Sequence, residues 1–528
     1  MSDSGGTATR IRDWHVVPGS IFLLYFLVRF WRLDEACLWF DEIFGLDAAA
    51  RSWGEMLRFI ALDLVHPPLF YILLKLWVGI GGESVAWVRL LPFVLSLLAV
   101  IPILQLCREL KLSRLATVVA FAAFAVNGSL IKYAQEVRMY SLTLLLAALS
   151  YWLFARFFFR GKNIWLLTAV NVLLVYTHYF GWFVVLSEAL TIALLQRIKI
   201  GKFLTSAAIT LLAFLPWTWA IWRAASTVDV AASASQNIGW IDRPGIVQLF
   251  DLAFDLIEPF YFQQSSSDAS TLIFITAPLL IILAAAKLIY LRRLAASADR
   301  TVFCFLAIVA VTPVAAAFAI SWLAPHSIWG TRHLTAAFIP ITILAAIFLT
   351  EIGDRWIRRL LLYTAALLAA GSFAVYAAAP REMNVWCAWE SLAVEARSDA
   401  VSPERVPVLT FEDLVAYHFW FALRDDPSLQ VVRVRGAAGV VEDAAYFLPR
   451  DAEGVSALDA SAVSGSPIFA AFRLTRNGPG REAVDPSQRE PLAGLVQRGY
   501  TVEYVRSIDA AGQTAYLAKL VMRAGGGR

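Results

Sequence analysis

Long apolar runs recur along most of this chain, and they constrain its fold more than any other feature. Many of the runs contain about 18 residues or more, enough for a helix to cross a bilayer. The chain is 59% hydrophobic and 16% charged, whereas about a quarter of the residues in a soluble domain are charged. The sequence therefore predicts an α-helical polytopic membrane protein. The net charge of +4 does not indicate a nucleic acid partner, because the basic residues lie in short loops.

About eleven membrane-spanning helices are expected. The predicted spans are 16–31, 89–107, 114–131, 138–158, 163–180, 183–196, 203–222, 271–291, 302–323, 334–352 and 357–378. One further apolar stretch, 67–82, is short. It begins at a pair of prolines and ends in a glycine-rich segment. Whether it crosses the membrane is decided by the orientation of the spans that follow it.

Basic residues determine the predicted orientation, because they collect on the cytoplasmic side of membrane proteins. Arg10 and Arg12 precede the first span, and later basic clusters occupy every second loop if 67–82 does not cross. We therefore predict that 67–82 is a juxtamembrane or re-entrant helix. The N-terminus is then cytoplasmic in a multi-pass protein of the inner (plasma) membrane, and the loops 34–66 and 223–270 lie on the outer face.

Two domains are predicted, a transmembrane domain over 1–380 and an extracytoplasmic α/β domain over 381–528. The second region has a soluble composition, in which short β-rich runs alternate with helical stretches. The expected strands are 406–410, 444–448, 467–472, 500–506 and 514–520, and the expected helices are 413–423 and 491–497. We expect this domain to be a lid or docking module without catalytic residues.

Four cysteines are present, and none forms a Cys-x-x-Cys or other metal-type spacing. Cys107 and Cys304 lie in or beside apolar runs and are expected to pack there. Cys37 and Cys387 both fall on the predicted outer side, where they can form a disulfide.

Two adjacent carboxylates, Asp41 and Glu42, follow the first span within the sequence Leu-Trp-Phe-Asp-Glu over 38–42. A carboxylate beside the membrane can remove the proton of an attacking hydroxyl, which is general-base work. Asp41 is the favoured base. Glu42 is the second candidate, acting directly or through a metal, because neighbouring residues do not share a helix face. The alternative is that both acids only begin a surface helix, where they favour the helix dipole.

Two arginines are candidates for binding phosphate. Arg138 and Arg332 are each predicted at the outer end of a span, and the planar guanidinium matches phosphate geometry. Ionisable groups at membrane depth are costly and usually functional. The alternative for each is an interfacial residue whose charged end reaches water. Arg29, at the end of the first span, is expected to be such an anchor.

Histidines and tyrosines accompany these arginines. His66, His178, Tyr140 and Tyr179 adjoin the charged motifs and can bind the phosphate or another polar group of a substrate. Together with the carboxylates, His66, His178 and His333 can also bind a divalent metal, since imidazole and carboxylate suit zinc or manganese. No histidine pair has the i, i+4 spacing of a helical metal motif, so no cofactor is required. The loop 223–270 is expected to cover the site with its acidic residues, Asp229, Asp242, Asp255 and Glu258.

The order of these motifs resembles a known family. After the carboxylate pair come His-Pro-Pro-Leu-Phe-Tyr over 66–71, Ala-Trp-Val-Arg-Leu-Leu-Pro over 86–92, Tyr-Ala-Gln-Glu-Val-Arg-Met-Tyr-Ser-Leu over 133–142, Thr-His-Tyr-Phe-Gly over 177–181 and Thr-Arg-His-Leu over 331–334. This order resembles the GT-C superfamily of polyprenyl-phosphate-dependent glycosyltransferases. Within it, the chain is similar to the bacterial branch related to protein O-mannosyltransferases and the lipid A aminoarabinose transferase.

The resemblance implies a membrane glycosyltransferase of the cell envelope. The donor would be a polyprenyl-phosphate sugar, hexosyl or pentosyl, and the acceptor a hydroxyl of a glycan, lipid or protein on the outer face. Transfer would invert the anomeric centre, with Asp41 as the base. Two other classes are open: a lipid or solute transporter or flippase, which would show internal repeats and broken helices, and a non-catalytic envelope assembly protein.

Overall fold

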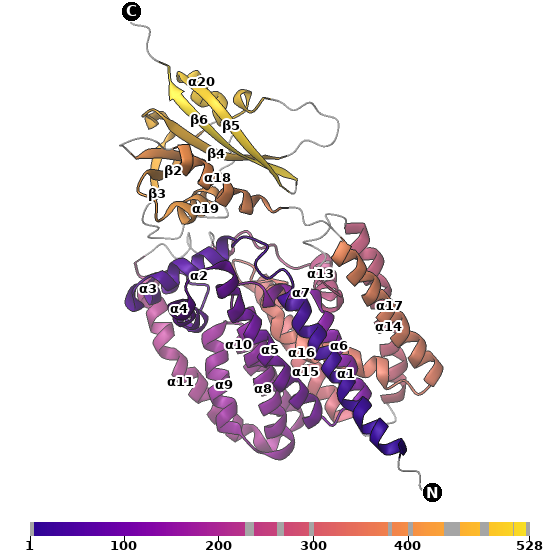
Figure 1. The fold of residues 1–528 in the computed structure, drawn as a ribbon. Helices are drawn as coiled ribbons and strands as arrows, with labels where there is room; N and C mark the ends of the chain where they lie inside the picture. The colour runs from indigo at the N-terminus through magenta and orange to yellow at the C-terminus, as the bar shows by residue number, and fades with distance from the viewer. Residues whose placement is uncertain are drawn as a thin grey trace, which may run out of the picture. The chain divides into compact units, whose positions relative to one another are not determined.

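The computed structural model describes residues 5–227, 237–260, 269–294, 300–378, 383–399, 405–437, 455–475, 485–510 and 512–523. The chain divides into two compact units (Figure 1). The first unit contains Met1–Asp34 and Ala48–Pro380, and the second contains Glu35–Asp47 and Arg381–Arg528. The second unit thus takes in a short segment from near the N-terminus, the one that carries Asp41 and Glu42.

Six helices in the described part of the first unit are long and apolar enough to cross a membrane, by length and composition. They are α5 (Val85–Glu109), α8 (Tyr140–Arg160), α11 (Ile200–Ala225) with η1 (Arg197–Lys199), α15 (Arg300–Leu323), α16 (Thr335–Thr350) with η2 (Thr331–Leu334), and α17 (Arg355–Ala378). Shorter apolar segments accompany them in α1 (Gly5–Phe30), α4 (Leu69–Gly81), α6 (Arg114–Val126), α9 (Ile164–Thr177), α10 (Gly181–Leu195) and α14 (Ala269–Leu294).

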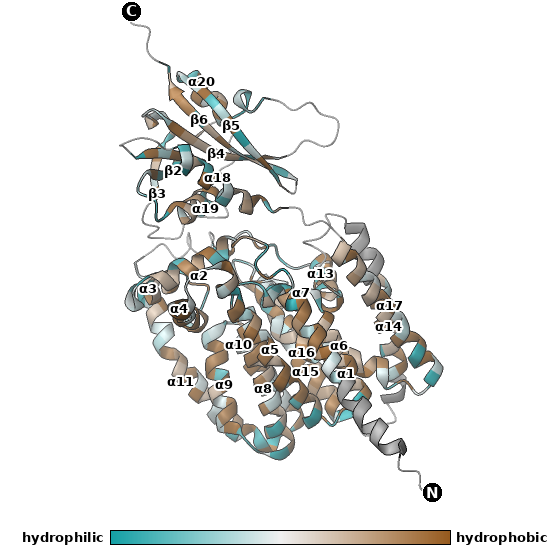
Figure 2. Cartoon of the chain, in the orientation of Figure 1, coloured by the Kyte–Doolittle hydropathy of each residue, from teal (hydrophilic) through white to brown (hydrophobic). Residues whose placement is uncertain are grey.

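Hydrophobic residues dominate these helices (Figure 2). A helix satisfies its backbone polar groups within its own segment, as a hydrocarbon environment requires. Each predicted span coincides with one of the long or shorter apolar helices, with α4 left over. The predicted polytopic helical fold is therefore confirmed.

Helix α4 corresponds to the short stretch 67–82. Pro68 caps its start, and Gly82, with φ of +85°, ends it. Its 13 residues extend about 20 Å, less than the roughly 30 Å of a bilayer core. The rings of Trp77 and Trp87 stack with centroids 4.6 Å apart, and a Cβ at Gly81 would lie 2.1 Å from the Trp87 ring. Gly81 therefore permits α4 to pack against α5. That α4 does not cross the membrane stays a prediction.

Three other helices bear on the site. Helices α2 (Phe40–Ala50) and α3 (Trp53–Asp63) lie within the predicted outer loop 34–66. Part of the stretch predicted as a loop over 223–270 is instead helix α13 (Ile246–Ile257), which is strongly amphipathic in sequence. The prediction missed this helix because its apolar residues occupy one face only and do not form an apolar run long enough to span a membrane.

The C-terminal end of α13 is attached to the break between α6 and α7 (Gly128–Ala134). Asn127 caps α7 and donates to the carbonyls of Asp255 and Leu256, each at 3.1 Å. The backbone N–H of Gly128 donates to the carbonyl of Glu258 at 3.0 Å. A Cβ at Gly128 would lie 2.2 Å from the carbonyl oxygen of Phe260, so glycine is required at this contact.

The second unit contains a six-stranded sheet in the order β3-β2-β1-β4-β6-β5. Strands β1 to β4 are parallel, and β6 and β5 pair antiparallel beyond β4. The strands are β1 (Val406–Thr410), β2 (Leu429–Arg435), β3 (Val455–Asp459), β4 (Ile468–Thr475), β5 (Tyr500–Ala510) and β6 (Gln513–Met522). The predicted α/β domain is confirmed.

Helices cover both faces of this sheet. Helices α18 (Val385–Asp399) and α19 (Asp413–Leu423) pack on one face, and α20 (Leu492–Gln497) packs on the other. Strands β2 and β3 and helix α18 were not predicted, and the expected strand 444–448 lies outside the described residues.

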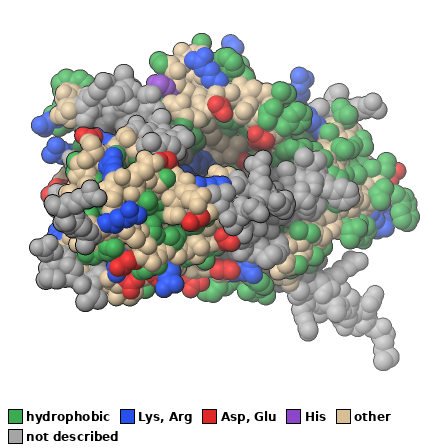
Figure 3. Space-filling model, turned by 90° about the horizontal axis from the view of Figure 1, so that it is seen from above, with side chains coloured by type: hydrophobic (Ala, Val, Ile, Leu, Met, Phe, Trp, Pro, Cys, Tyr) green, Lys and Arg blue, Asp and Glu red, His purple; other side chains and the backbone are tan. Residues whose placement is uncertain are grey.

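Figure 3 shows a face of the molecule on which positively charged Lys and Arg side chains are interspersed with negatively charged Asp and Glu side chains.

The disulfide between Cys37 and Cys387 is confirmed, with a Cα–Cα distance of 5.2 Å across 350 residues of sequence. Both cysteines belong to the second unit. Cys107 and Cys304 are free thiols, the first buried and the second partly buried, as their apolar surroundings predicted.

Candidate active site

A hydrogen-bonded pair, Asp63 and His66, lies where α3 ends. Asp63 is the last residue of α3, and Leu64 then adopts the left-handed conformation with φ of +62°. This reversal brings His66 back toward the helix end, so that its Nδ1 lies 2.6 Å from Asp63 Oδ2. Pro67 and Pro68 follow directly and lead into α4. The prediction named His66 but missed Asp63.

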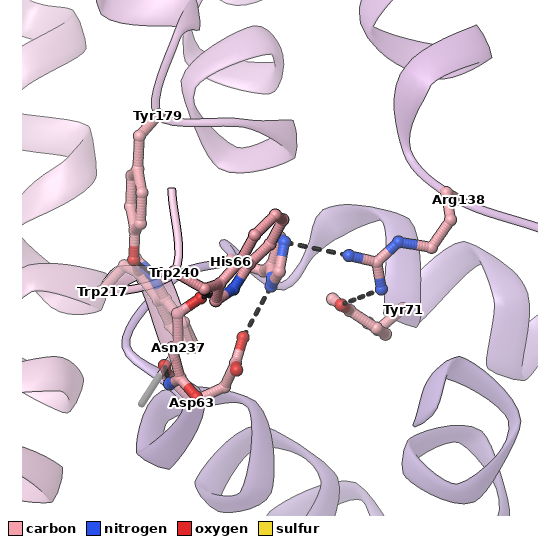
Figure 4. A network of polar contacts seen from close by, with 8 residues as sticks. All are labelled: Asp63, His66, Tyr71, Arg138, Tyr179, Trp217, Asn237 and Trp240. Atoms are coloured by element: carbon pink, nitrogen blue, oxygen red, sulfur yellow. Dashed lines mark hydrogen bonds and ion pairs between the residues drawn. The ribbon is translucent and has the colours of Figure 1, made fainter. Parts of the chain in front are cut away.

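Arg138 completes this cluster from the short segment between α7 and α8 (Figure 4). Its guanidinium lies 2.9 Å from His66 Nε2 and donates to the Tyr71 hydroxyl at 3.2 Å. A guanidinium can only donate, so His66 Nε2 is the acceptor and Nδ1 carries the proton toward Asp63. Arg138 is 2% exposed, which makes it a buried cation within a polar network and not an anchor in contact with water.

His178 lies in the turn between α9 and α10. It is buried, and its Nδ1 accepts from the backbone N–H of Phe180 at 3.1 Å. Because Nδ1 accepts this hydrogen bond it carries no proton, so His178 is neutral and its Nε2 carries the N–H. His66, Arg138 and Arg332 lie close enough to His178 to interact with it electrostatically. Four of the predicted donor-binding residues thus act on one another.

Arg332 lies in η2, next to His333. Its guanidinium carbon is 5.7 Å from the centroid of the Trp240 ring, a distance at which a cation is attracted to an aromatic face. The His333 ring lies 5.2 Å from the His178 ring. The neighbouring Thr331 hydrogen-bonds the carboxyl of Asp255, and burial raises the pKa of that carboxyl.

The two predicted tyrosines have different surroundings. The Tyr179 hydroxyl accepts from the Trp217 indole N–H at 3.2 Å (Figure 4). Tyr140 is buried at the start of α8, with its ring 4.8 Å from that of Tyr133. Tyr179 therefore lies at the edge of the polar network, whereas Tyr140 is packed beside it.

The segment after residue 236 closes the network on the other side. The Asn237 side chain donates to the backbone carbonyl of Asp63 at 2.6 Å, and the Trp240 indole donates to the carbonyl of Asn237 at 3.0 Å. Figure 4 shows Asn237 and Trp240 beside Asp63 and His66. Residues 228–236 of the predicted loop, which include Asp229, lie outside the described residues. That the loop 223–270 covers the site stays a prediction.

Asp41 and Glu42 lie in the first turn of α2, within the second unit. The Glu42 carboxylate accepts from the backbone N–H of Trp39 at 3.1 Å, and the Trp39 carbonyl accepts from the N–H groups of Glu42 and Ile43. Glu42 therefore caps the helix, as the third residue of a capping box does. This role favours Asp41 over Glu42 for chemistry.

Metal binding stays a prediction. Among the described residues, no group of three or more His, Cys, Asp or Glu side chains is arranged to hold a metal ion. His66 Nε2 faces the guanidinium of Arg138, and a ring nitrogen that already faces one cation is poorly disposed toward a second. We therefore assign no chemical step to a metal.

The prediction that Arg29 is an interfacial anchor is wrong. Arg29 is 0% exposed. It donates to the carbonyls of Phe124 and Ala125, each at 2.9 Å, and its guanidinium lies 3.5 Å from the Tyr25 ring centroid. These carbonyls lie at the C-terminal end of α6, where an arginine satisfies groups that have no partner within the helix. Arg29 therefore joins α1 to α6.

Two solved structures are similar to this fold over nearly the whole chain. The structure of ArnT from Cupriavidus metallidurans bound to undecaprenyl phosphate matches with a TM-score of 0.58 and 11% identity, over 98% of both chains. The apo structure of the same protein matches with a TM-score of 0.53 and 12% identity, also over 98% of both chains. The chain therefore shares its fold with these ArnT structures.

Other comparisons add little. The apo oligosaccharyltransferase of Archaeoglobus fulgidus has a TM-score of 0.44 and 13% identity, over 77% of this chain and 63% of that one. No protein-family model and no curated protein sequence matches the chain. The resemblance to GT-C enzymes expected from the motifs is therefore confirmed as one of fold, and it extends over both units.

Proposed function

We propose that this protein is a membrane glycosyltransferase. It transfers a sugar from a polyprenyl-phosphate donor to a hydroxyl of an envelope glycan, lipid or protein on the outer face of the plasma membrane. Asp41 takes the proton of the acceptor hydroxyl, the oxygen attacks the anomeric carbon, and the bond from that carbon to the phosphate oxygen breaks. The anomeric centre is inverted, and the lipid phosphate leaves with the electron pair.

The leaving group requires positive charge, because its phosphate changes from a singly charged diester to a more highly charged monoester. Fixed donors that strengthen where charge develops stabilise the transition state. Arg138 supplies a planar guanidinium that is held by the His66 ring nitrogen, which accepts its hydrogen bond, and the neutral His178 supplies an N–H donor nearby. Arg332 adds a second cation near the same group of histidines.

One observation carries this proposal: the buried Arg138 is held by His66 and Tyr71, in a chain whose fold matches an ArnT structure that contains undecaprenyl phosphate. A buried cation in a polar cluster between membrane helices is suited to bind the phosphate of a lipid. A transporter or flippase would share the lipid site but would not cleave the donor. An assembly protein would require no such cluster.

The test is a transfer assay with purified protein in lipid nanodiscs. Polyprenyl-phosphate donors carrying radiolabelled hexoses or pentoses are incubated with envelope extract as the acceptor source. A transferase releases free lipid phosphate and labels an acceptor, whereas a flippase leaves the donor intact. A donor panel that stays intact while the lipid phosphate binds would contradict the enzymatic assignment. Mass spectrometry of envelope glycolipids and glycoproteins from a deletion strain identifies the acceptor.

A further inference from the structure

We infer that the C-terminal α/β domain holds the segment that carries Asp41, so that Cys387 and Tyr417 are positioning residues for the catalytic base. This inference rests on the proposed function, because it assigns a positioning role toward Asp41. It gives the soluble domain a part in catalysis, although that domain contributes no group to the chemistry. All the contacts involved lie within the second unit.

The first attachment is covalent. Cys37 lies four residues before Asp41 in the sequence, and its sulfur is bonded to that of Cys387 on α18. The backbone N–H of Cys37 also donates to Cys387 Sγ at 3.3 Å. Helix α18 is itself anchored in the domain core through Trp389, Leu392 and neighbouring residues. The start of the segment is thus fixed to a packed helix.

The second attachment lies on the other side of Asp41. The Tyr417 hydroxyl donates to the Asp47 carboxylate at 3.0 Å, and Tyr417 is 0% exposed. The Phe40 ring lies 5.2 Å from the Tyr417 ring, which stacks on Trp420 at 5.2 Å. One side chain of α19 therefore contacts residues both before and after Asp41.

These two attachments bracket the helix start at which Asp41 is found. The capping contact of Glu42 with Trp39 then fixes the local backbone of the same turn. A base acts only when it is within hydrogen-bond reach of the proton it removes, and small misplacements cost large factors in rate. Loosening either attachment should therefore lower kcat, while the donor phosphate residues of the first unit stay unaltered.

The test compares kcat and the donor KM of matched variants. Tyr417→Phe removes the hydroxyl and keeps the ring, and Cys37→Ser combined with Cys387→Ser removes the disulfide. Tyr504→Phe is the control, because the Tyr504 hydroxyl also bonds an aspartate, Asp399, elsewhere in the same domain. Cys304→Ser is the control for loss of a cysteine that has no disulfide.

We expect Tyr417→Phe to lower kcat about tenfold or more, since a hydrogen bond to a charged group is lost, with an unchanged donor KM. The double serine variant, or folded wild-type protein treated with a phosphine reductant, should show a similar loss. Asp47→Asn, which keeps an acceptor for the Tyr417 hydroxyl, should retain more activity than Tyr417→Phe. Both controls should keep the wild-type kcat.

The outcomes separate the two proposals. If Asp41→Asn is inactive but Tyr417→Phe and the reduced protein keep the wild-type kcat, the positioning inference fails and the proposed base stands. If Asp41→Asn itself keeps the wild-type kcat, the assignment of the base fails, and with it the inference. If Tyr504→Phe loses as much kcat as Tyr417→Phe, the effect is a general one on the domain and the inference is also overturned.

Discussion

The two units hold their buried charges in different ways. In the first unit, Arg29 is surrounded by backbone carbonyls and hydroxyls, and the Glu188 carboxyl is bonded by Ser150 and Asn171. In the second unit, arginines pair directly with carboxylates, as Arg433 does with Asp413 at 2.6 Å. Some buried charged side chains of the apolar helix bundle are therefore bonded to neutral groups, whereas buried arginines of the sheet domain form ion pairs with carboxylates.

The comparison teaches that depth alone does not identify a functional charge. Ionisable residues within membrane helices are functional candidates by default, yet Arg29 is explained by its structural contacts. Arg138 differs because it lies in a polar segment between helices and contacts a histidine whose own partner is Asp63. A chain of titratable groups, and not a single buried cation, marks the candidate site.

The largest expected effect concerns the only group of the second unit that we assign to chemistry. Asp41→Asn removes the negative charge and keeps the shape, so kcat should fall by about 10²–10⁴-fold, the typical contribution of a general base. Glu42→Gln should instead lower the midpoint of thermal unfolding, because Glu42 caps α2, with a smaller change in kcat. Steady-state kinetics and thermal unfolding of both variants check this. A greater loss of kcat in Glu42→Gln than in Asp41→Asn would assign the general base to Glu42.

The arginines of the first unit should differ in function, since some bind the donor phosphate and others only stabilise the fold. Arg138→Lys and Arg332→Lys should each lower kcat/KM for the donor about tenfold to a hundredfold, because a lysine point charge cannot replace a guanidinium fork. Arg29→Lys should lower the thermal midpoint while the folded protein keeps its donor KM. Arg223, which is exposed and stacks on Trp219 at 4.9 Å, is the control. Equal donor KM values for all four variants would erase the distinction.

A buried acid of the first unit should make stability depend on pH. Burial, assisted by the charge of Asp255, raises the pKa of Glu258 to about 8, and neither oxygen has a hydrogen-bond partner among the described residues. The unfolded chain ionises at a lower pH than the folded one. Glu258 should therefore cost no stability in acid, and stability should fall as pH rises from about 4.5 to about 8. Each unit of pKa difference is worth about 1.4 kcal/mol.

Glu258→Gln should flatten this dependence, since the amide does not titrate. Thermal midpoints measured across the same pH range check the sign. A wild-type midpoint that rises with pH in this window, and a variant that follows it, would contradict the role given to burial.

The smallest effect is expected at the surface of the second unit. Arg397 pairs with Asp426 at 2.6 Å, but its side chain is 47% exposed, and exposed pairs are worth about 0–1 kcal/mol. Arg397→Gln should therefore leave stability and donor KM nearly unchanged. Arg433→Gln leaves the partly buried Asp413 without its partner and should destabilise more. Denaturant unfolding of the two variants checks this ranking. A larger loss of stability in Arg397→Gln than in Arg433→Gln would contradict the difference between exposed and buried ion pairs.

Much of the fold follows from patterns in the sequence. The length of the apolar runs predicts the spans, and the prolines and glycines around 67–82 predict the ends of α4. Strand β1 and helix α19 have the predicted bounds, because a short alternating run and an acidic first turn mark them. Helix α13 and strands β2 and β3 were missed, since their signals are short and their partners are distant in sequence.

The candidate site was predicted residue by residue but not as a network. His66, Arg138, His178 and Arg332 were named, and the structure brings them together. Asp63 was missed. Its position three residues before His66 is the sequence signal that could have revealed it. The contact also depends on the left-handed conformation of Leu64, which reverses the chain. The grouping of residues 35–47 with the C-terminal domain depends on Cys387 and Tyr417, and no local pattern encodes such a distant pairing.

The central claim is that the phosphate of the lipid donor binds at Arg138, and a binding titration tests it most directly. Undecaprenyl phosphate is titrated into wild type, Asp41→Asn and Arg138→Ala in nanodiscs, with native mass spectrometry as the readout and thermal unfolding as the control for folding. We expect wild type and Asp41→Asn to bind with the same Kd, and Arg138→Ala to bind at least about tenfold more weakly, the loss of a charge-assisted contact. Folded Arg138→Ala with the wild-type Kd would contradict the account and place the phosphate elsewhere.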